Sequence, residues 1–224
     1  MTNVVLVVIT DGRQPATILD AITSAEEHLK CDFSARFIVD DSGDEANAEW
    51  LERTFPQFQI VHHAERRGLA GAVRSAWTTA LAAGADYVFQ AEDDFIYNRK
   101  VKVEKLVQLL HCEPHLAQVS LKRQPVNEHE VACGGFIQTA PDSYYDVECP
   151  SGKFVEHTRL FSFNPCLIQR AAIEDALAAG GDWLEQGITD ALKAHKWTFA
   201  IWGTKDDPPR VHHIGDHRSS GWSL

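Results

Sequence analysis

The sequence lacks any hydrophobic run long enough to span a membrane as a helix. The apolar run at residues 4–9, VVLVVI, is short, whereas a membrane-spanning helix needs about 20 apolar residues. No basic leader or small-residue cleavage site accompanies this run, which argues against a signal peptide. We therefore expect residues 4–9 to form a buried strand and the protein to have no membrane span.

Cysteine is scarce and has no motif spacing. The sequence holds five cysteines, an odd number, and no Cys-x-x-Cys pair. Structural zinc sites and disulfide frameworks depend on paired and regularly spaced cysteines, so neither is expected. Unpaired thiols are typical of a reducing compartment, and we expect the protein to be cytoplasmic. The five are Cys31, Cys112, Cys133, Cys149 and Cys166.

Basic residues are too few to balance the acidic ones. Lysine and arginine number 21 against 32 aspartates and glutamates, which gives a formal net charge of −11. An acidic surface repels a phosphate backbone, so extended electrostatic binding to DNA is disfavoured. A carboxylate-rich metal site would contribute to the same imbalance. A local basic face remains open, formed by Arg66, Arg67, Lys100, Lys102, Lys105, Lys122 and Arg123.

The sequence does contain a regular alternation of strand and helix signals. Hydrophobic residues make up 44% of the 224 residues, which is enough for the core of one domain. In the first half we expect strands at 4–9, 35–39, 58–62 and 87–90, and helices at 15–29, 46–54, 70–83 and 101–111. This order predicts an α/β fold with a mostly parallel sheet flanked by helices. In the second half we expect strands at 118–122, 161–165 and 198–203, helices at 171–179 and 183–195, and a polar loop or hairpin at 126–153.

Polar and acidic clusters follow three of the expected strands. They are TDGR at 10–13, DDS at 40–42 and EDD at 92–94. In open α/β sheets, ligands bind beyond the carboxyl ends of the strands. We therefore expect the three clusters to converge on one edge of the sheet and to form the functional site there.

Glu92, Asp93 and Asp94 place three carboxylates at one strand end. Adjacent carboxylates repel one another, and a hard divalent cation with oxygen ligands relieves that repulsion. An ion that also bridges a diphosphate stabilises charge on a leaving group. A solvated acidic turn is the alternative interpretation. His213, next to His212 near the end of the sequence, is a second candidate ligand, with a surface histidine as the alternative.

Residues 66–74, RRGLAGAVR, open the expected alanine-rich helix. Helix N-termini and arginines both favour anions, so Arg67 and Arg74 are candidate nucleotide contacts; an ordinary basic helix start is the alternative. The glycine spacing gives neither GxGxxG nor a Walker loop, which argues against a dinucleotide or ATP site. No serine or cysteine lies in a nucleophile elbow, so a hydrolase triad lacks support.

Glu185 and Asp190 lie in the expected helix at 183–195 and are candidate general bases. A carboxylate beside the reacting sugar can take the proton of an acceptor hydroxyl. Each of them can equally be a surface carboxylate of the helix, so the sequence leaves open which one acts.

Together these motifs resemble the GT-A glycosyltransferases, and the inverting family-2 type in particular, over residues 3–218. FIVDDSGD at 37–44 is similar to the family's VVDDGSTD segment, and EDD at 92–94 to its DxD motif. Residues 67–74 are similar to the family's NxGxxxAxN helix, and VHHIG at 211–215 resembles the C-terminal histidine segment of metal-dependent members.

The resemblance implies a single GT-A (Rossmann-like) domain at residues 1–224. Residues 1–100 would bind the nucleotide-sugar, and residues 101–224 would form the acceptor side and a metal-binding tail. The implied cofactor is Mn²⁺ or Mg²⁺ on Asp94 and His213, the implied donor is a UDP-sugar, and Asp190 or Glu185 would act as base in an inverting transfer. The implied nucleotide contacts are Thr10, Asp11, Arg13, Asp40, Asp41, Arg67, Arg74, Glu92 and Asp93.

The acceptor and two other functions remain open at this point. A glycan, a protein, a small molecule and a hydroxylated DNA base are all compatible with the sequence as acceptors. A sugar-phosphate nucleotidyltransferase also joins a parallel sheet to a carboxylate-bound metal, but it would be expected to carry a glycine-rich, lysine-containing segment near the first strand. A non-catalytic nucleotide-sugar binding protein is the second alternative.

Overall fold

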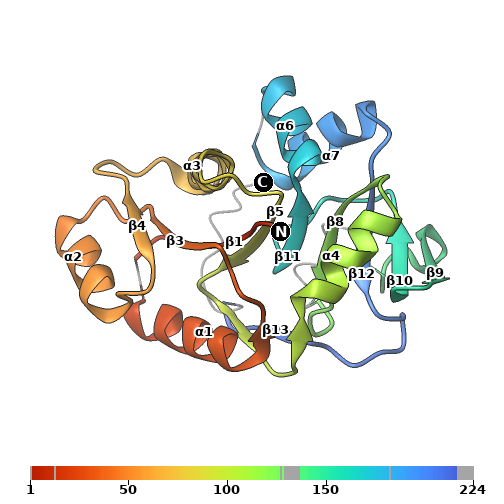
Figure 1. Cartoon of the computed structure of the whole chain (residues 1–224), viewed down its shortest axis with the longest axis horizontal. Helices are drawn as coiled ribbons and strands as arrows, with labels where there is room; N and C mark the ends of the chain where they lie inside the picture. Colours follow the sequence, from red (N-terminus) through yellow and green to blue (C-terminus); the bar gives the residue numbers. More distant parts are fainter. Residues whose placement is uncertain (1, 13, 127, 129–136, 182, 216–224) are drawn as a thin grey trace.

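A nine-stranded sheet crosses the centre of the molecule (Figure 1). The structure is a computed structural model that describes residues 2–12, 14–126, 128, 137–181 and 183–215. The sheet strands are β1 (Val4–Thr10), β3 (Ala35–Asp40), β4 (Gln59–His62), β5 (Tyr87–Glu92), β8 (Leu116–Leu121), β9 (Tyr144–Cys149), β10 (Gly152–His157), β11 (Cys166–Gln169) and β12 (Thr198–Trp202). Within the described residues their order is β4-β3-β1-β5-β11-β8-β12-β10-β9.

Most of the sheet strands point the same way. β4, β3, β1 and β5 are mutually parallel, and β8 pairs in parallel with β12. Only β11 and β10, among the strands that the structure describes, run against the others. The expected α/β architecture with a mostly parallel sheet is therefore confirmed.

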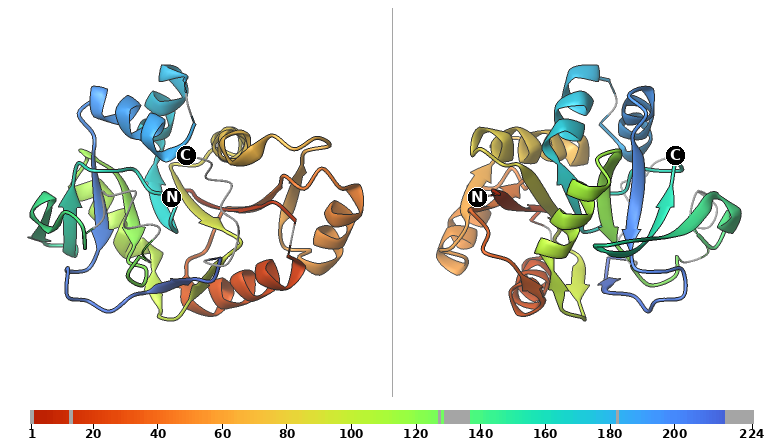
Figure 2. Two further views of the ribbon diagram at one scale, coloured as in Figure 1. Left: turned by 180° about the vertical axis from the view of Figure 1, so that it is seen from behind. Right: turned by 45° about the vertical axis from the view of Figure 1, so that its right-hand side comes forward.

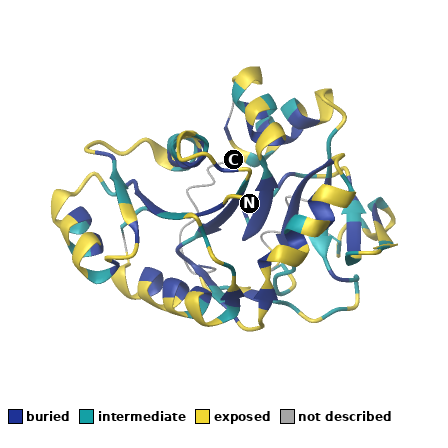
Figure 3. Cartoon of the chain, in the orientation of Figure 1, coloured by how far each residue is buried: buried dark blue, intermediate teal, exposed yellow. Residues whose placement is uncertain are grey.

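Helices cover both faces of the sheet, as two further views show (Figure 2). α1 (Pro15–His28), α2 (Glu45–Thr54) and α4 (Val103–Cys112) pack into one hydrophobic core. α3 (Gly68–Ala82), α6 (Arg170–Ala179) and α7 (Glu185–Ala194) pack into the other. Side chains of β1 point alternately to the two faces of the sheet. Val4, Leu6 and Val8 therefore pack into the first core, and the residues between them pack into the second. Buried strands between half-exposed helices are visible in Figure 3.

Short elements complete the fold. β6 (Phe95–Tyr97) pairs antiparallel with β13 (Val211–His213), and β2 (Leu29–Lys30) pairs in parallel with β7 (Val101–Lys102). One 3₁₀ turn, η1 (Pro141–Ser143), precedes the β9–β10 hairpin. In the described part of the chain, no helix has the length and apolarity needed to cross a bilayer.

The prediction of a strand at 161–165 is wrong. Those residues are irregular, and the strand begins only at Cys166 as β11. The N–H groups of Phe161 and Phe163 donate to the Thr189 hydroxyl and the Glu185 carboxylate, at 2.7 Å each, rather than to a strand ladder. The two phenylalanines are buried, so their hydrophobicity reflects packing of a loop and not strand structure.

Candidate functional site

The carboxyl ends of β1, β3 and β5 meet at one edge of the sheet. Thr10 is the register partner of Asp40, and Ile9 is that of Glu92. The pairing continues past the strand end, because the Asp93 N–H donates to the Ile9 carbonyl at 3.0 Å. The expected convergence of the three acidic clusters is confirmed.

Thr10 ties the first cluster to the third. Its hydroxyl donates to Asp93 Oδ2 at 2.5 Å and accepts from the Gly12 N–H at 3.1 Å. Both Thr10 and Asp93 are buried, so this contact braces the ends of β1 and β5. Asp11 is half-buried, and Arg13 lies outside the described residues. The nucleotide contacts predicted for these residues stay predictions.

Asp94 lies against a histidine from the other end of the chain. Asp94 Oδ2 and His213 Nε2 are 3.1 Å apart, and the two side chains are only 11% and 20% exposed. The His213 ring also stacks on Phe95, with centroids 4.8 Å apart. His212, its neighbour on β13, is exposed, so of the histidine pair it is His213 that reaches the acidic cluster.

Gln124 holds the His213 backbone from the other side. Its amide accepts from the His213 N–H at 2.8 Å and donates to the His213 carbonyl at 2.9 Å. The adjacent Arg123 forms a parallel bridge with Val211. β13 therefore runs between β6 and the segment that follows β8, which fixes the position of the imidazole.

The Asp94–His213 pair fits a divalent metal ion. Two ligands in adjacent positions of an octahedral ion, each about 2.1 Å from it, lie about 3 Å apart, close to the 3.1 Å observed. Gly215 keeps this position open, because a Cβ there would clash with the Asp94 carboxylate and approach the imidazole. The described residues contain no group of three or more His, Cys, Asp or Glu side chains arranged for a metal.

The Asp40 carboxylate accepts hydrogen bonds from its own loop and from neighbouring elements. Its buried carboxylate accepts from the Ser42 N–H and hydroxyl, both at 3.0 Å, from the Asn47 amide at 2.9 Å, and from the His62 ring, where Nδ1 lies at 2.8 Å. A carboxylate has about four acceptor positions, and these contacts occupy them. Asp40 thus organises the loop, a geometry that does not favour its predicted contact with a nucleotide.

Asp41 is held differently from its neighbour. Its Oδ1 accepts from the Arg67 N–H and lies against His63 Nδ1, both at 2.8 Å. His63 Nε2 in turn lies 2.8 Å from the Ser75 hydroxyl on α3. The chain Asp41–His63–Ser75 joins the β3 loop to that helix.

Two arginines line a hollow on the exposed side of α3. The hollow measures about 370 Å³ and is lined by Arg67, Gly71, Arg74, Ser75 and Thr78. The Arg74 guanidinium lies 5.7 Å from the centre of the Trp183 ring, just ahead of α7. The structure thus leaves both predicted arginines exposed next to the Asp41 loop.

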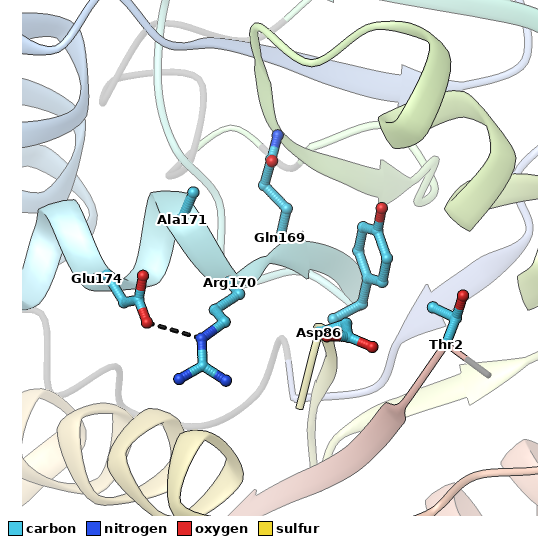
Figure 4. Close-up of a pocket in the computed structure, with 7 residues that line it drawn as sticks. Thr2, Asp86, Gln169, Arg170, Ala171 and Glu174 are labelled. Atoms are coloured by element: carbon cyan, nitrogen blue, oxygen red, sulfur yellow. Dashed lines mark hydrogen bonds and ion pairs between the residues drawn. The ribbon is translucent and has the colours of Figure 1, made fainter. Parts of the chain in front are cut away.

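A second hollow, of about 390 Å³, lies at the far edge of the sheet (Figure 4). It is lined by residues where β5 begins and β11 ends, including Tyr87 and Gln169. Arg170 and Glu174, which line it, form an ion pair with each other at 2.7 Å. Because Glu92 is at the opposite end of β5, this hollow is separate from the acidic site.

Glu185 is half-buried, whereas Asp190 is exposed. Burial raises the pKa of the Cys166 thiol, and the Glu92 and Glu185 carboxylates raise it further. Glu185 is half-buried at the start of α7 and accepts from the Phe163 N–H at 2.7 Å. Asp190 accepts from the Gln186 amide at 2.9 Å on the helix surface. The role of either carboxylate as base stays a prediction.

Sequence reasoning missed His62, His63, Ser75 and Gln124. His62 ends β4 and His63 follows it, just as Asp40 ends β3 and Asp41 follows it. The two strands are parallel, with Asp40 opposite His62. That juxtaposition of DD and HH was the available signal. Nothing in the local sequence marks Ser75 or Gln124.

The fold is that of GT-A glycosyltransferases. The mannosyltransferase PcManGT from Pyrobaculum calidifontis, in complex with GDP-Man and Mn²⁺, is 16% identical with a TM-score of 0.61 over 97% of this chain and 58% of that one. GalNAc-T7 with UDP, GalNAc and Mn²⁺ is 12% identical with a TM-score of 0.62 over 99% of this chain and 45% of that one. The present chain thus spans about half the length of each matched structure.

The sequence itself identifies the family. The model of glycosyl transferase family 2 matches residues 5–144, which is more than half of the chain. The protein therefore belongs to glycosyl transferase family 2. No functionally curated protein sequence matches it.

Proposed function

We propose that this protein transfers a sugar from a nucleoside-diphosphate sugar to an acceptor hydroxyl, with a divalent metal ion held by Asp94 and His213. The observation that carries the proposal is the contact of these two side chains at the edge where the strand ends meet. Family membership supports the reaction class, and both similar structures contain Mn²⁺ with a nucleotide or nucleotide-sugar.

The metal, when bound, would neutralise the diphosphate leaving group. The chain supplies one carboxylate oxygen from Asp94 and one imidazole nitrogen from His213. Diphosphate oxygens and water would supply further ligands, as is usual for Mg²⁺ at phosphates. Gly215 preserves the space between the two ligands and the substrate.

Residues 1–100 form the donor side in this proposal. Asp41 would read the base, and Arg67 and Arg74 would attract the phosphates. Thr10, Asp11, Arg13, Glu92 and Asp93 complete the predicted nucleotide contacts, and Asp40 holds the loop. A UDP-sugar is the donor we propose, because a carboxylate acceptor at Asp41 suits a base with a ring N–H, such as uracil.

Glu185 is the general base that we propose for the acceptor side, residues 101–224. It would take the hydroxyl proton as the acceptor oxygen attacks the anomeric carbon from the face opposite the diphosphate. The bond from that carbon to the diphosphate oxygen breaks, so the anomeric configuration inverts. Asp190 remains the alternative base on sequence grounds only.

The test is release of UDP from a panel of UDP-sugars with Mn²⁺, with and without chelator. We expect metal-dependent UDP release by the wild type, loss in Asp94→Asn, and no loss in Asp20→Asn, a matched exposed aspartate on α1. Pyrophosphate release from UTP and a sugar phosphate would instead indicate a nucleotidyltransferase. Tight UDP-sugar binding without release or transfer would indicate a non-catalytic binding protein.

A further inference from the structure

The two adjacent aspartates of the β3 loop differ in one respect that matters for recognition. Asp40 has its acceptor positions occupied by loop groups, whereas both described contacts of Asp41 fall on Oδ1. The Asp41 side chain is 7% exposed and directly follows the end of β3. Asp41 therefore presents one carboxylate oxygen at the edge of the sheet where the strand ends meet.

We propose that His63 and Ser75 are positioning residues that hold Asp41 as an acceptor and thereby select donor bases that carry a ring N–H. This inference rests on the proposed function, since it assumes that a nucleotide binds at this edge. It adds two residues that position the base contact already proposed for Asp41.

The geometry of His63 allows little freedom. The side chain is 3% exposed, and each ring nitrogen has one partner at 2.8 Å, Asp41 on Nδ1 and Ser75 on Nε2. A serine hydroxyl can donate to Nε2 while Nδ1–H donates to the carboxylate, which satisfies both ring nitrogens of a neutral imidazole. The Asp41 carboxylate requires the hydrogen on Nδ1, and the Ser75 hydroxyl supports this tautomer by donating to Nε2.

Two donors on one oxygen fix the plane of the carboxylate. The His63 ring and the Arg67 N–H both reach Oδ1, so the Asp41 side chain cannot rotate without breaking both contacts. The direction of Oδ2 is therefore determined before any ligand arrives. Preorganisation of this kind lowers the cost of binding.

An ionised carboxylate only accepts hydrogen bonds. Uracil, thymine and guanine each present a ring N–H to such an acceptor, whereas cytosine and adenine present a lone pair at the corresponding position. Polar sites built to hydrogen-bond one partner reject an analogue that leaves a buried group unpaired. Asp41 should therefore accept UDP, TDP or GDP and reject CDP and ADP.

Two substitutions at one position separate the donor role of His63 from its packing role. His63→Asn keeps an N–H near the position of Nδ1, facing Asp41, but loses the contact with Ser75. His63→Gln places its N–H near the position of Nε2, facing Ser75, and loses the donor to Asp41. Both remove the imidazole ring, so damage to packing is comparable in the two variants.

The experiment is calorimetric titration of the full chain, with Mn²⁺ present, using UDP, GDP, CDP and ADP. We expect the wild type and His63→Asn to prefer a base with a ring N–H by at least about tenfold, and His63→Gln to lose about tenfold of that preference. Thermal unfolding midpoints of the two variants provide the control for folding.

The outcomes separate this inference from the function on which it rests. If the wild type binds no nucleotide, the proposed function fails and the inference with it. If the wild type shows the preference but His63→Gln keeps it, or both variants lose it equally, the inference alone is overturned. Ser75→Ala provides a second test. Loss of the hydroxyl that donates to His63 Nε2 should weaken UDP binding several-fold while leaving CDP binding unchanged.

Discussion

The Asp94 carboxylate and the His213 imidazole lie 3.1 Å apart although 119 residues separate them in the sequence. The pairing of β13 with β6 brings them together, because Asp94 directly precedes β6 and His213 ends β13. The contact is thus set by backbone pairing and not by the reach of long side chains. Changes that displace this ribbon should affect metal binding before they affect the stability of the domain.

Gln124→Ala should weaken Mn²⁺ binding by about 10- to 100-fold, the usual effect of removing a group that orients a ligand. The amide brackets the His213 backbone on both sides, so its loss frees the imidazole to move. Mn²⁺ titration monitored by electron paramagnetic resonance measures the change. Gln57→Ala, an exposed glutamine bonded to Glu26, is the control, and equal affinities in the two variants would contradict the role of Gln124.

Gly215→Ala should reduce metal-dependent UDP binding by at least about tenfold while leaving the fold intact. The added methyl group would clash with the Asp94 carboxylate and push the two ligands apart. The thermal unfolding midpoint of Gly215→Ala provides the control for folding. A Gly215→Ala protein with wild-type affinity for UDP and Mn²⁺ would show that the metal does not occupy this space.

Glu185→Gln should lower kcat for transfer or UDP-sugar hydrolysis by about 10²- to 10⁴-fold, the range attributed to a general base. The amide can no longer take a proton, but its size is the same, so KM for the donor should change little. Asp190→Asn should retain activity near the wild-type level because Asp190 is exposed and bonded to Gln186. The reverse pattern in steady-state kinetics would assign the base to Asp190.

The stability of the protein should fall on acidification partly through His157. Burial, together with the smaller effect of the Lys193 charge, lowers the pKa of His157 to about 3, whereas an unfolded histidine titrates near pH 6.5. Between about pH 6.5 and pH 3, His157 is protonated in the unfolded chain but not in the folded one. The free energy of unfolding therefore decreases as pH falls, by up to roughly 1.4 kcal/mol per pH unit.

Urea unfolding at pH 8 and pH 5 measures this contribution. His157 lies between the rings of Tyr144 and Phe199, so His157→Phe can occupy a similar space without a titrating group. We expect the difference in unfolding free energy between the two pH values to be smaller in His157→Phe than in the wild type. An unchanged difference would show that His157 does not contribute.

The convergence of the strand ends was predictable from the sequence because its signals are local. A run such as VVLVVI indicates a strand by itself, and turn residues such as Asp11 and Gly12 mark where it ends. Parallel order then places all such ends at one edge. The family resemblance added His213, which no local pattern in the tail distinguishes from a surface histidine.

The remaining features depend on contacts between residues far apart in sequence. His63 bonds to Asp41 22 residues away, and Gln124 to His213 89 residues away, so no periodicity reveals either pair. Residues 161–165 alternate Phe161 and Phe163 with polar residues as a strand does, yet both phenylalanines are buried in a loop. Side-chain capping of its N–H groups by Thr189 and Glu185 appears only once α7 is placed.

Calorimetric titration of the wild type, Asp94→Asn and His213→Ala with UDP, in Mn²⁺ and in chelator, tests the central claim most directly. The account predicts that wild-type UDP affinity depends on Mn²⁺ and that both variants lose at least about tenfold of it in Mn²⁺, while all three proteins behave alike in chelator. A UDP affinity that is the same with and without Mn²⁺, or that is unchanged by both substitutions, would contradict the assignment of Asp94 and His213 as the metal-binding pair.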